Sequence, residues 1–117
     1  MALSLEEANR IAAGALAKAG ELGIRINVAV CDSGGRLLEF QGKAIASAAF
    51  GRPSGDLTER EAHPTFRAIV AHEGGHMILG QGGVPVIRDG IVEGAVGVGG
   101  GTGQEDEVCA QAGAARI

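Results

Sequence analysis

Aromatic side chains are scarce in this sequence of 117 residues, which has three phenylalanines and no tryptophan or tyrosine. Proteins that bind nucleic acids use basic surfaces for the phosphates and, for single strands, aromatic rings on which the bases stack. Here 10 basic side chains stand against 14 acidic ones, a formal net charge of −4. We therefore expect no nucleic-acid partner.

Cysteine and long hydrophobic runs are also lacking. The two cysteines, Cys31 and Cys109, are too few for a disulfide framework and lack CxxC spacing, so Cys109 is expected to be a small buried hydrophobe. No apolar run approaches the roughly 18 residues of a membrane helix. The sequence begins with acidic residues where a secretory signal is basic. These absences predict a cytoplasmic protein that does not contact a membrane.

Glycine and aliphatic side chains are what the sequence has in quantity. Hydrophobic residues make up 45% and charged residues 21%, which is typical of a soluble globular domain. The 21 glycines follow no three-residue period, which excludes a collagen helix. We expect one domain over residues 1–117. Its core of alanine and glycine is thin, which favours assembly into a homo-oligomer.

Helix starts are marked by residue pairs that satisfy the free amides of a first turn. Ser4 and Glu7 predict a helix with a mostly alanine stripe that can lie close to its neighbour and stops at Gly20 or Gly23. The remaining signals predict, in chain order, a helix over Lys43–Phe50, a brief one begun by Asp56 and Glu59 and stopped by His63-Pro64, a helical turn over Thr65–Ala71, and a last helix from Thr102 and Glu105 to Ala114.

Strands are indicated by alternating apolar residues and by turn signals. Ile24 to Cys31 alternates as a strand with one buried face does, and Asp89-Gly90 is a strong two-residue hairpin signal. The strands we expect are Ile24–Cys31, a returning Leu37–Phe40, a short Met77–Leu79, Val84–Arg88 and Ile91–Val98. Hairpins with a segregated helical middle predict an α+β fold with an antiparallel sheet.

The segment from His72 to His76 reads His-Glu-Gly-Gly-His and matches the letters of the zinc-protease motif. That motif needs one helix carrying both histidines, whereas each glycine costs about 1 kcal/mol in a helix interior. A third ligand at the spacing of zinc proteases is also missing. Solvated loop histidines are therefore the first interpretation. The alternative is that His72 and His76, with His63 behind them, bind haem iron or a divalent metal.

A glycine-rich run from Gly97 to Thr102 stands between a strand and a helix, where backbone amides can point at an anion. It matches neither the dinucleotide fingerprint nor the phosphate-binding loop. A structural turn is one interpretation, and a cradle for a carboxylate or propionate is the other. The candidate ligand-binding residues are Lys43, Gly82, Gly83, Gly99 and Gly100; Lys43 either is solvated or pairs with an acid group of a ligand.

Five segments, taken together and in this order, resemble the GlcG/HbpS family: Val28–Leu38, Gly42–Ala44, Phe50–Ser54, Gly82–Val86 and Gly94–Gly100. The resemblance extends over nearly the whole chain. It implies a profilin-like α+β domain with helices packed on an antiparallel sheet, commonly assembled into oligomers, and some members bind haem. No iron ligand carries over, because the haem-binding members do not share one. Phe40 runs straight into Gln41 where relatives have a longer connection, which we interpret as a deletion that rebuilds a pocket wall or as an omitted segment.

The resemblance and the residues together predict a small-ligand-binding protein that takes haem, another tetrapyrrole or a small anionic metabolite near a subunit interface. A second hypothesis is a lyase, isomerase or tautomerase acting on a small carboxylic acid. In that enzyme His72 or His76 would be the general base, and Lys43 would hold the carboxylate. A third hypothesis is a non-catalytic accessory subunit with no ligand of its own. The resemblance further implies a place in a catabolic operon.

Overall fold

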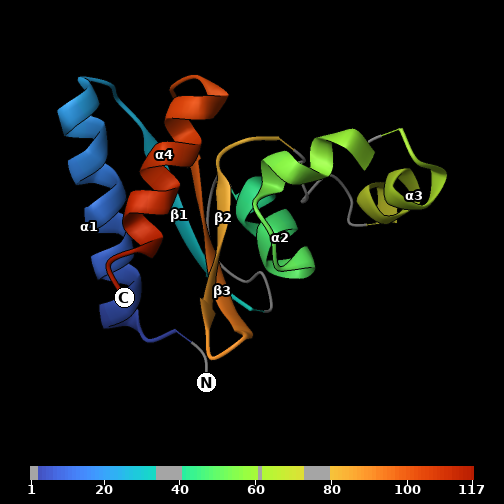
Figure 1. The fold of residues 1–117 in the computed structure, drawn as a ribbon, viewed down its shortest axis with the longest axis horizontal. Coiled ribbons are helices and arrows are strands. Elements are labelled where there is room, and N and C mark those ends of the chain that lie inside the picture. The colour runs from blue at the N-terminus through green and yellow to red at the C-terminus, as the bar shows by residue number, and fades with distance from the viewer. Residues whose placement is uncertain (1–2, 34–40, 61, 73–79) are drawn as a thin grey trace.

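The computed structural model describes residues 3–33, 41–60, 62–72 and 80–117. Its elements are α1 (Leu5–Leu22), β1 (Asn27–Asp32), α2 (Gln41–Phe50), the 3-10 helix η1 (Ser54–Arg60), α3 (Pro64–His72), β2 (Gly83–Arg88), β3 (Ile91–Gly99) and α4 (Gly103–Ala114). The strands form one antiparallel sheet with helices packed on it, which confirms the predicted α+β class (Figure 1). No helix among the described residues is long and apolar enough to cross a bilayer.

The first and last helices begin as the capping pairs predict. The Ser4 side chain accepts the backbone N–H of Glu7, and the Glu7 carboxylate accepts the backbone N–H of Ser4. Thr102 and Glu105 exchange the same two hydrogen bonds at the start of α4. Gly23, with φ +69°, ends α1 in the left-handed conformation that glycine adopts at little cost.

The sheet has the order β1–β3–β2, so the second strand of the β2–β3 hairpin is central. Asp89 and Gly90 close this hairpin with positive φ values of 52° and 76°, as the Asp-Gly signal predicts. β1 begins at Asn27 rather than at Ile24, because pairing with β3 starts at Asn27 opposite Gly99. The predicted strands Leu37–Phe40 and Met77–Leu79 lie outside the described residues.

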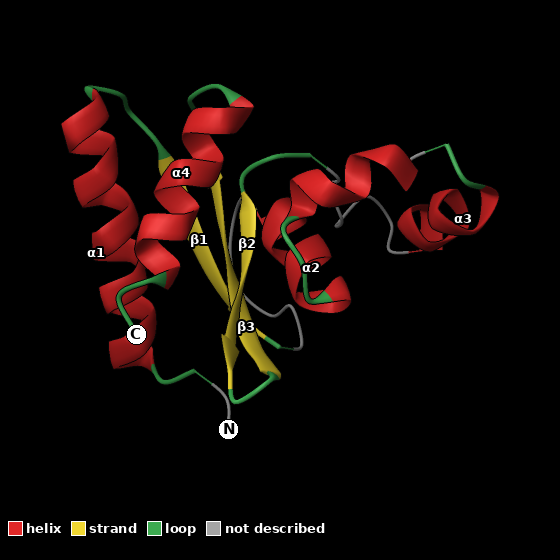
Figure 2. Cartoon of the chain, in the orientation of Figure 1, coloured by secondary structure: helices red, strands yellow, loops and turns green. Residues whose placement is uncertain are grey.

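The described sheet lies between two layers of helices (Figure 2). Helices α1 and α4 pack on the face that carries Val96 and Val98, and α2 packs on the opposite face. The prediction of one buried face for the first strand was therefore wrong. Ala29 and Cys31, expected to face outward, are only 4% and 1% exposed. Their small side chains leave room for the alanines of α2.

A segment that we call the arm, described over residues 50–60 and 62–72, extends away from the sheet and carries η1 and α3 (Figure 1). Leu57 of η1 is fully buried against Ala46, whereas no residue of α3 is buried. The expected turn over Thr65–Ala71 is a nine-residue helix, and His63-Pro64 begins it rather than only stopping the helix before it. His63 Nδ1 accepts the backbone N–H of Thr65 at 3.2 Å, and proline suits the first position of a helix.

An arginine on β2 joins the first helix to the sheet. The Arg88 guanidinium donates to both carboxylate oxygens of Glu7 on α1 and to the carboxylate of Glu93 on β3. The Ser4 backbone N–H, followed by Arg88, lowers the pKa of Glu7 from 4.5 to about 2. Arg88 also lowers the pKa of Glu93. Both carboxylates therefore stabilise the fold in their charged form.

Glu7 should make folding sensitive to acid. Its charge contributes fully above pH 4.5, its ordinary pKa, and the contribution should disappear as the pH falls to about 2, its pKa in the fold. We expect Glu7→Gln to lower the melting temperature at pH 7, and the gap to the parent to close between these two pH values. Glutamine keeps the capping box, so the change isolates the charge. Glu6→Gln, exposed on the same turn, is the control, and an equal effect there would contradict the assignment.

Candidate functional site

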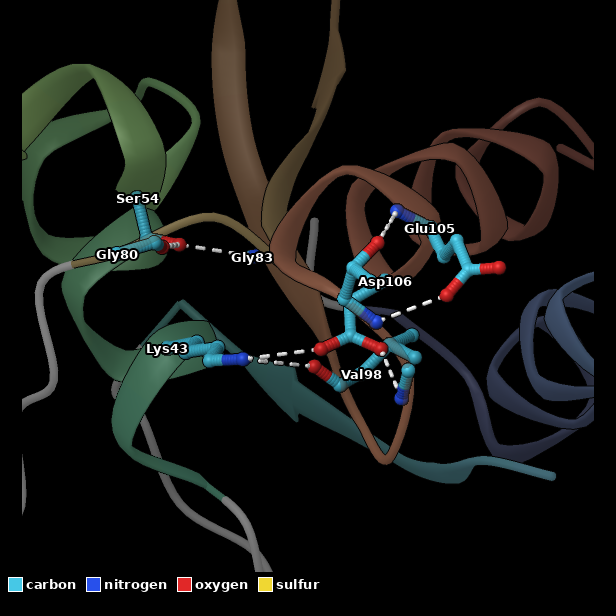
Figure 3. Close-up of polar contacts among 9 residues, drawn as sticks. Lys43, Ser54, Gly80, Gly83, Val98, Glu105 and Asp106 are labelled. Atoms are coloured by element: carbon cyan, nitrogen blue, oxygen red, sulfur yellow. Dashed lines mark hydrogen bonds and ion pairs between the residues drawn. The ribbon is translucent and has the colours of Figure 1, made fainter. Parts of the chain in front are cut away.

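Lys43 lies where α2, β3 and α4 meet, and its ammonium group has two partners on distant parts of the chain (Figure 3). Its Nζ donates to the Val98 carbonyl at 3.2 Å and to Asp106 Oδ2 at 3.3 Å. The Asp106 side chain is only 4% exposed and that of Lys43 24% exposed. This lysine is therefore an internal ion-pair partner and not the solvated side chain that was one of its two interpretations.

Asp106 fills the anion position that the glycine-rich run forms. Its Oδ1 accepts the backbone N–H of Gly101 at 2.9 Å, while Oδ2 accepts Lys43. The partial positive charge of the α4 N-terminus is thus met by a carboxylate of the same helix. Of the two interpretations of the glycine-rich run from Gly97 to Thr102, this arrangement favours a structural turn over a cradle for the carboxylate of a ligand.

Gly82 and Gly83 complete this region, which we call the Lys43 junction (Lys43, Ser54, Gly82, Gly83, Val98 and Asp106). A Cβ on Gly82 would lie 2.6 Å from the Val98 carbonyl oxygen and 2.9 Å from Lys43 Nζ. A Cβ on Gly83 would lie 2.3 Å from the Lys43 carbonyl oxygen. Glycine is required here because backbone and ammonium group approach so closely.

Ser54 is a member of the junction that the sequence analysis did not single out. It is fully buried, its Oγ accepts the Gly83 N–H at 2.8 Å, and it donates to the Gly80 carbonyl. Ser54 stands directly after Pro53, at the end of the family-like segment Phe50–Ser54 and at the start of η1. This place indicates a helix start rather than a bond to β2.

The other two candidate glycines lie elsewhere. Gly99 pairs with Asn27 in the sheet, and a Cβ on Gly100 would lie 2.7 Å from the Arg25 carbonyl oxygen. The structure therefore brings Lys43, Gly82 and Gly83 together. It places Gly99 opposite the first residue of β1 and Gly100 against the segment that leads into this strand. Ligand binding by any of these residues remains a prediction.

Of the two histidines in the motif that resembles a zinc site, only His72 belongs to the described residues. His72 is the last residue of α3 and is exposed, and His76 lies outside the described residues. His63 caps α3 through Nδ1. Among residues 3–33, 41–60, 62–72 and 80–117, no three His, Cys, Asp or Glu side chains are grouped to hold a metal ion.

The arm contains the aromatic and cationic cluster of the described chain. The rings of Phe50 and Phe66 stack with centroids 5.0 Å apart, and the Arg60 guanidinium lies over Phe66 at 5.5 Å. The His63 ring meets Phe66 edge-on at 6.5 Å. Stacking and cation–π contacts of this kind hold α3, which has no buried residue of its own, to the rest of the arm.

An open hollow of about 410 Å³ lies between η1 and α3. Its walls are Thr58 and Glu59 of η1, Ala62, and Arg67 of α3. The hollow thus has one cationic and one anionic wall residue. Its volume is in the range of small-molecule sites, and its open form leaves part of any occupant in water.

The two cysteines are buried, Cys31 against α2 and Cys109 between the sheet and α1. Burial, and after it the negative charge of Asp106, raises the pKa of the Cys109 thiol. A raised pKa keeps a thiol protonated and poorly nucleophilic. The prediction that Cys109 is a small buried hydrophobe is confirmed.

Several solved structures share this fold, and each of them matches nearly the whole chain. ORFY from Klebsiella pneumoniae is 26% identical with a TM-score of 0.87, covering 97% of this chain and 89% of that one. A double mutant of HbpS from Streptomyces reticuli is 28% identical with a TM-score of 0.86, covering 100% and 88%. A complex of PduOC with heme is 23% identical with a TM-score of 0.86, covering 100% and 96%. A search of the curated proteins finds no match.

The class of protein that these neighbours define is a small α+β domain of the HbpS type. The family model of haem degrading protein HbpS-like matches residues 40–115. The chain therefore belongs to the HbpS-like family, as the resemblance predicted. The matched range includes the Lys43 junction, the arm and α4.

Proposed function

We propose that this protein binds haem or a related tetrapyrrole through its arm. The family match supports this proposal, since the family is described as haem degrading. HbpS itself shares the fold at 28% identity. The heme complex of PduOC, at lower identity, adds that the same fold accommodates heme.

The observation that carries the proposal is where the relevant side chains lie. Two of the three phenylalanines and two of the three histidines of the sequence belong to residues 50–72, on α3 or next to it in the arm. A tetrapyrrole is bound by apolar contact with its ring, by an axial ligand to its metal and by cations near its acid groups. The arm has side chains of all three kinds, whereas in the Lys43 junction the ammonium is already paired.

The described residues fit haem with His72 as the imidazole available to iron. It is exposed at the end of α3, five residues beyond Arg67 of the hollow. His63 fits this role less well. Its Nδ1 accepts a backbone N–H, so the neutral ring keeps its proton on Nε2, and a protonated nitrogen cannot ligate iron. Haem iron, when bound, would supply the redox and ligand chemistry, and the arm would hold and orient it.

Haemin titration tests the proposal. We expect haemin to give a shifted Soret band with the parent protein and a different, weaker shift with the His72→Ala/His76→Ala double variant, because the imidazole ligand is then lost. His63→Asn is the matched control, since asparagine is also a good helix cap and should leave the band as it is in the parent. Absence of any shift in the parent would refute haem binding. An unchanged band in the double variant would retire His72 and His76 as ligands.

A further inference from the structure

The geometry points to the hollow between η1 and α3 as a carboxylate-recognition site in which Arg67 binds the acid group of the ligand. This inference rests on the proposed function, and it names the part of the ligand that the arm selects. For a tetrapyrrole the acid group is a propionate at the ring edge. For a small metabolite it is the carboxylate itself.

Arg67 is suited to this role because it lines the hollow and forms no ion pair with the other charged residue there. The ion pairs within the described residues are Lys18–Glu21, Lys43–Asp106 and those of Arg88, and none involves Arg67 or Glu59. A guanidinium presents a planar set of donors that matches a carboxylate with two parallel hydrogen bonds. Thr58 adds a hydroxyl group from the η1 side of the hollow.

Recognition in the arm also depends on polar groups, because part of its aromatic surface is taken up by contacts within the arm. Phe66 stacks on Phe50, lies under the Arg60 guanidinium and meets His63 edge-on. Phe50 and Phe66 are both partly buried, so part of each ring remains for apolar contact with a tetrapyrrole. The open hollow accepts one edge of a flat ligand and leaves the rest in water, so the charged group at that edge has to provide the selectivity.

Glu59 is the second charged wall residue, and its carboxylate repels an incoming acid group. Removing the charge of Arg67 and removing the charge of Glu59 should therefore change the affinity for haemin in opposite directions. Arg67→Gln should weaken haemin binding about tenfold, the effect of losing one charge-assisted interaction. Glu59→Gln should strengthen binding severalfold, because the repulsion is removed. A folding defect would weaken binding in both variants, so an opposite pair of effects identifies electrostatic recognition.

The experiment compares haemin with its dimethyl ester, whose propionates are neutral, in the parent, Arg67→Gln, Glu59→Gln and Arg10→Gln proteins. Arg10 is an exposed arginine on α1 outside the arm, and its variant should bind as the parent does. We expect the ester to bind weakly and equally to all four proteins. Equal binding of ester and acid, or an Arg67→Gln variant that binds haemin like the parent, would overturn the inference while leaving haem binding intact.

Succinate, a simple dicarboxylate, distinguishes the two sources of the acid group. Displacement of haemin by millimolar succinate from the parent but not from Arg67→Gln would indicate a site that takes small carboxylic acids as well. Binding of haemin unaffected by succinate, with the ester difference retained, would indicate the propionates of a tetrapyrrole. A parent protein that binds neither haemin nor succinate would overturn both the inference and the proposed function.

Discussion

Lys43→Met is expected to destabilise the protein by about 3 kcal/mol, as removal of one partner of a largely buried ion pair does. Asp106 is 4% exposed, so without the ammonium its carboxylate would stay inside the fold with the Gly101 N–H as its remaining partner. The Val98 carbonyl would lose a donor as well. Urea unfolding at pH 7 measures the change as a lower midpoint with an unchanged slope.

A second lysine on the same chain is the control. Lys18 pairs with Glu21 at 3.2 Å on the surface of α1, with the two side chains 34% and 69% exposed. Such an exposed pair contributes about 0.5 kcal/mol or less, so Lys18→Met should change stability little. The double variant Lys43→Met/Asp106→Asn should recover most of the loss, because an amide oxygen still accepts the Gly101 N–H without needing a cation. Strictly additive single effects would contradict a coupled pair.

The features that the sequence predicted best are helix starts and tight turns, which depend on residues close together in the chain. The capping boxes at Ser4 and Thr102 and the Asp89-Gly90 hairpin need only residues within one turn, and the structure confirms them. The family resemblance, carried by motifs along the chain, is confirmed as well. Local hydrogen bonds follow from local residue types, so such signals keep their meaning in any fold.

What the sequence could not predict depends on contacts between distant segments. The Lys43–Asp106 pair joins residues 63 positions apart, and Ser54 bonds to a backbone amide 29 positions away. No spacing rule connects such residues before the topology is known. The proline after His63 predicts the end of a helix, but proline is also favoured at the first position of the next one, and the residues alone do not distinguish the two. The hollow depends on how η1 and α3 pack, and the sequence predicts only a helical turn where α3 lies.

The mostly alanine stripe of α1 predicts that this helix can lie close to whatever it covers, and the structure packs α4 against it. The two helices meet at glycines in their interiors, Gly14 of α1 and Gly113 of α4. The sequence pattern does not predict this contact, because neither glycine belongs to a turn. A Cβ on Gly113 of α4 would lie 2.5 Å from the Ile11 carbonyl oxygen and 3.3 Å from the Ala15 Cβ. The first distance is too short for any real contact, and the atom that it meets belongs to helix backbone, which cannot turn aside.

Gly113→Ala should therefore destabilise the protein by about 2–3 kcal/mol, because α1 and α4 must separate and the core beneath them loses contact. Gly20→Ala on α1 is the matched control. Gly20 is helical and exposed, and a Cβ there meets nothing within 4 Å. The same substitution at this position should stabilise the protein by about 0.5–1 kcal/mol, since alanine favours the helix and restricts the unfolded chain. Thermal unfolding of the two variants should thus move the midpoint in opposite directions. A Gly113→Ala protein as stable as Gly20→Ala would mean that the two helices do not approach each other closely at Gly113.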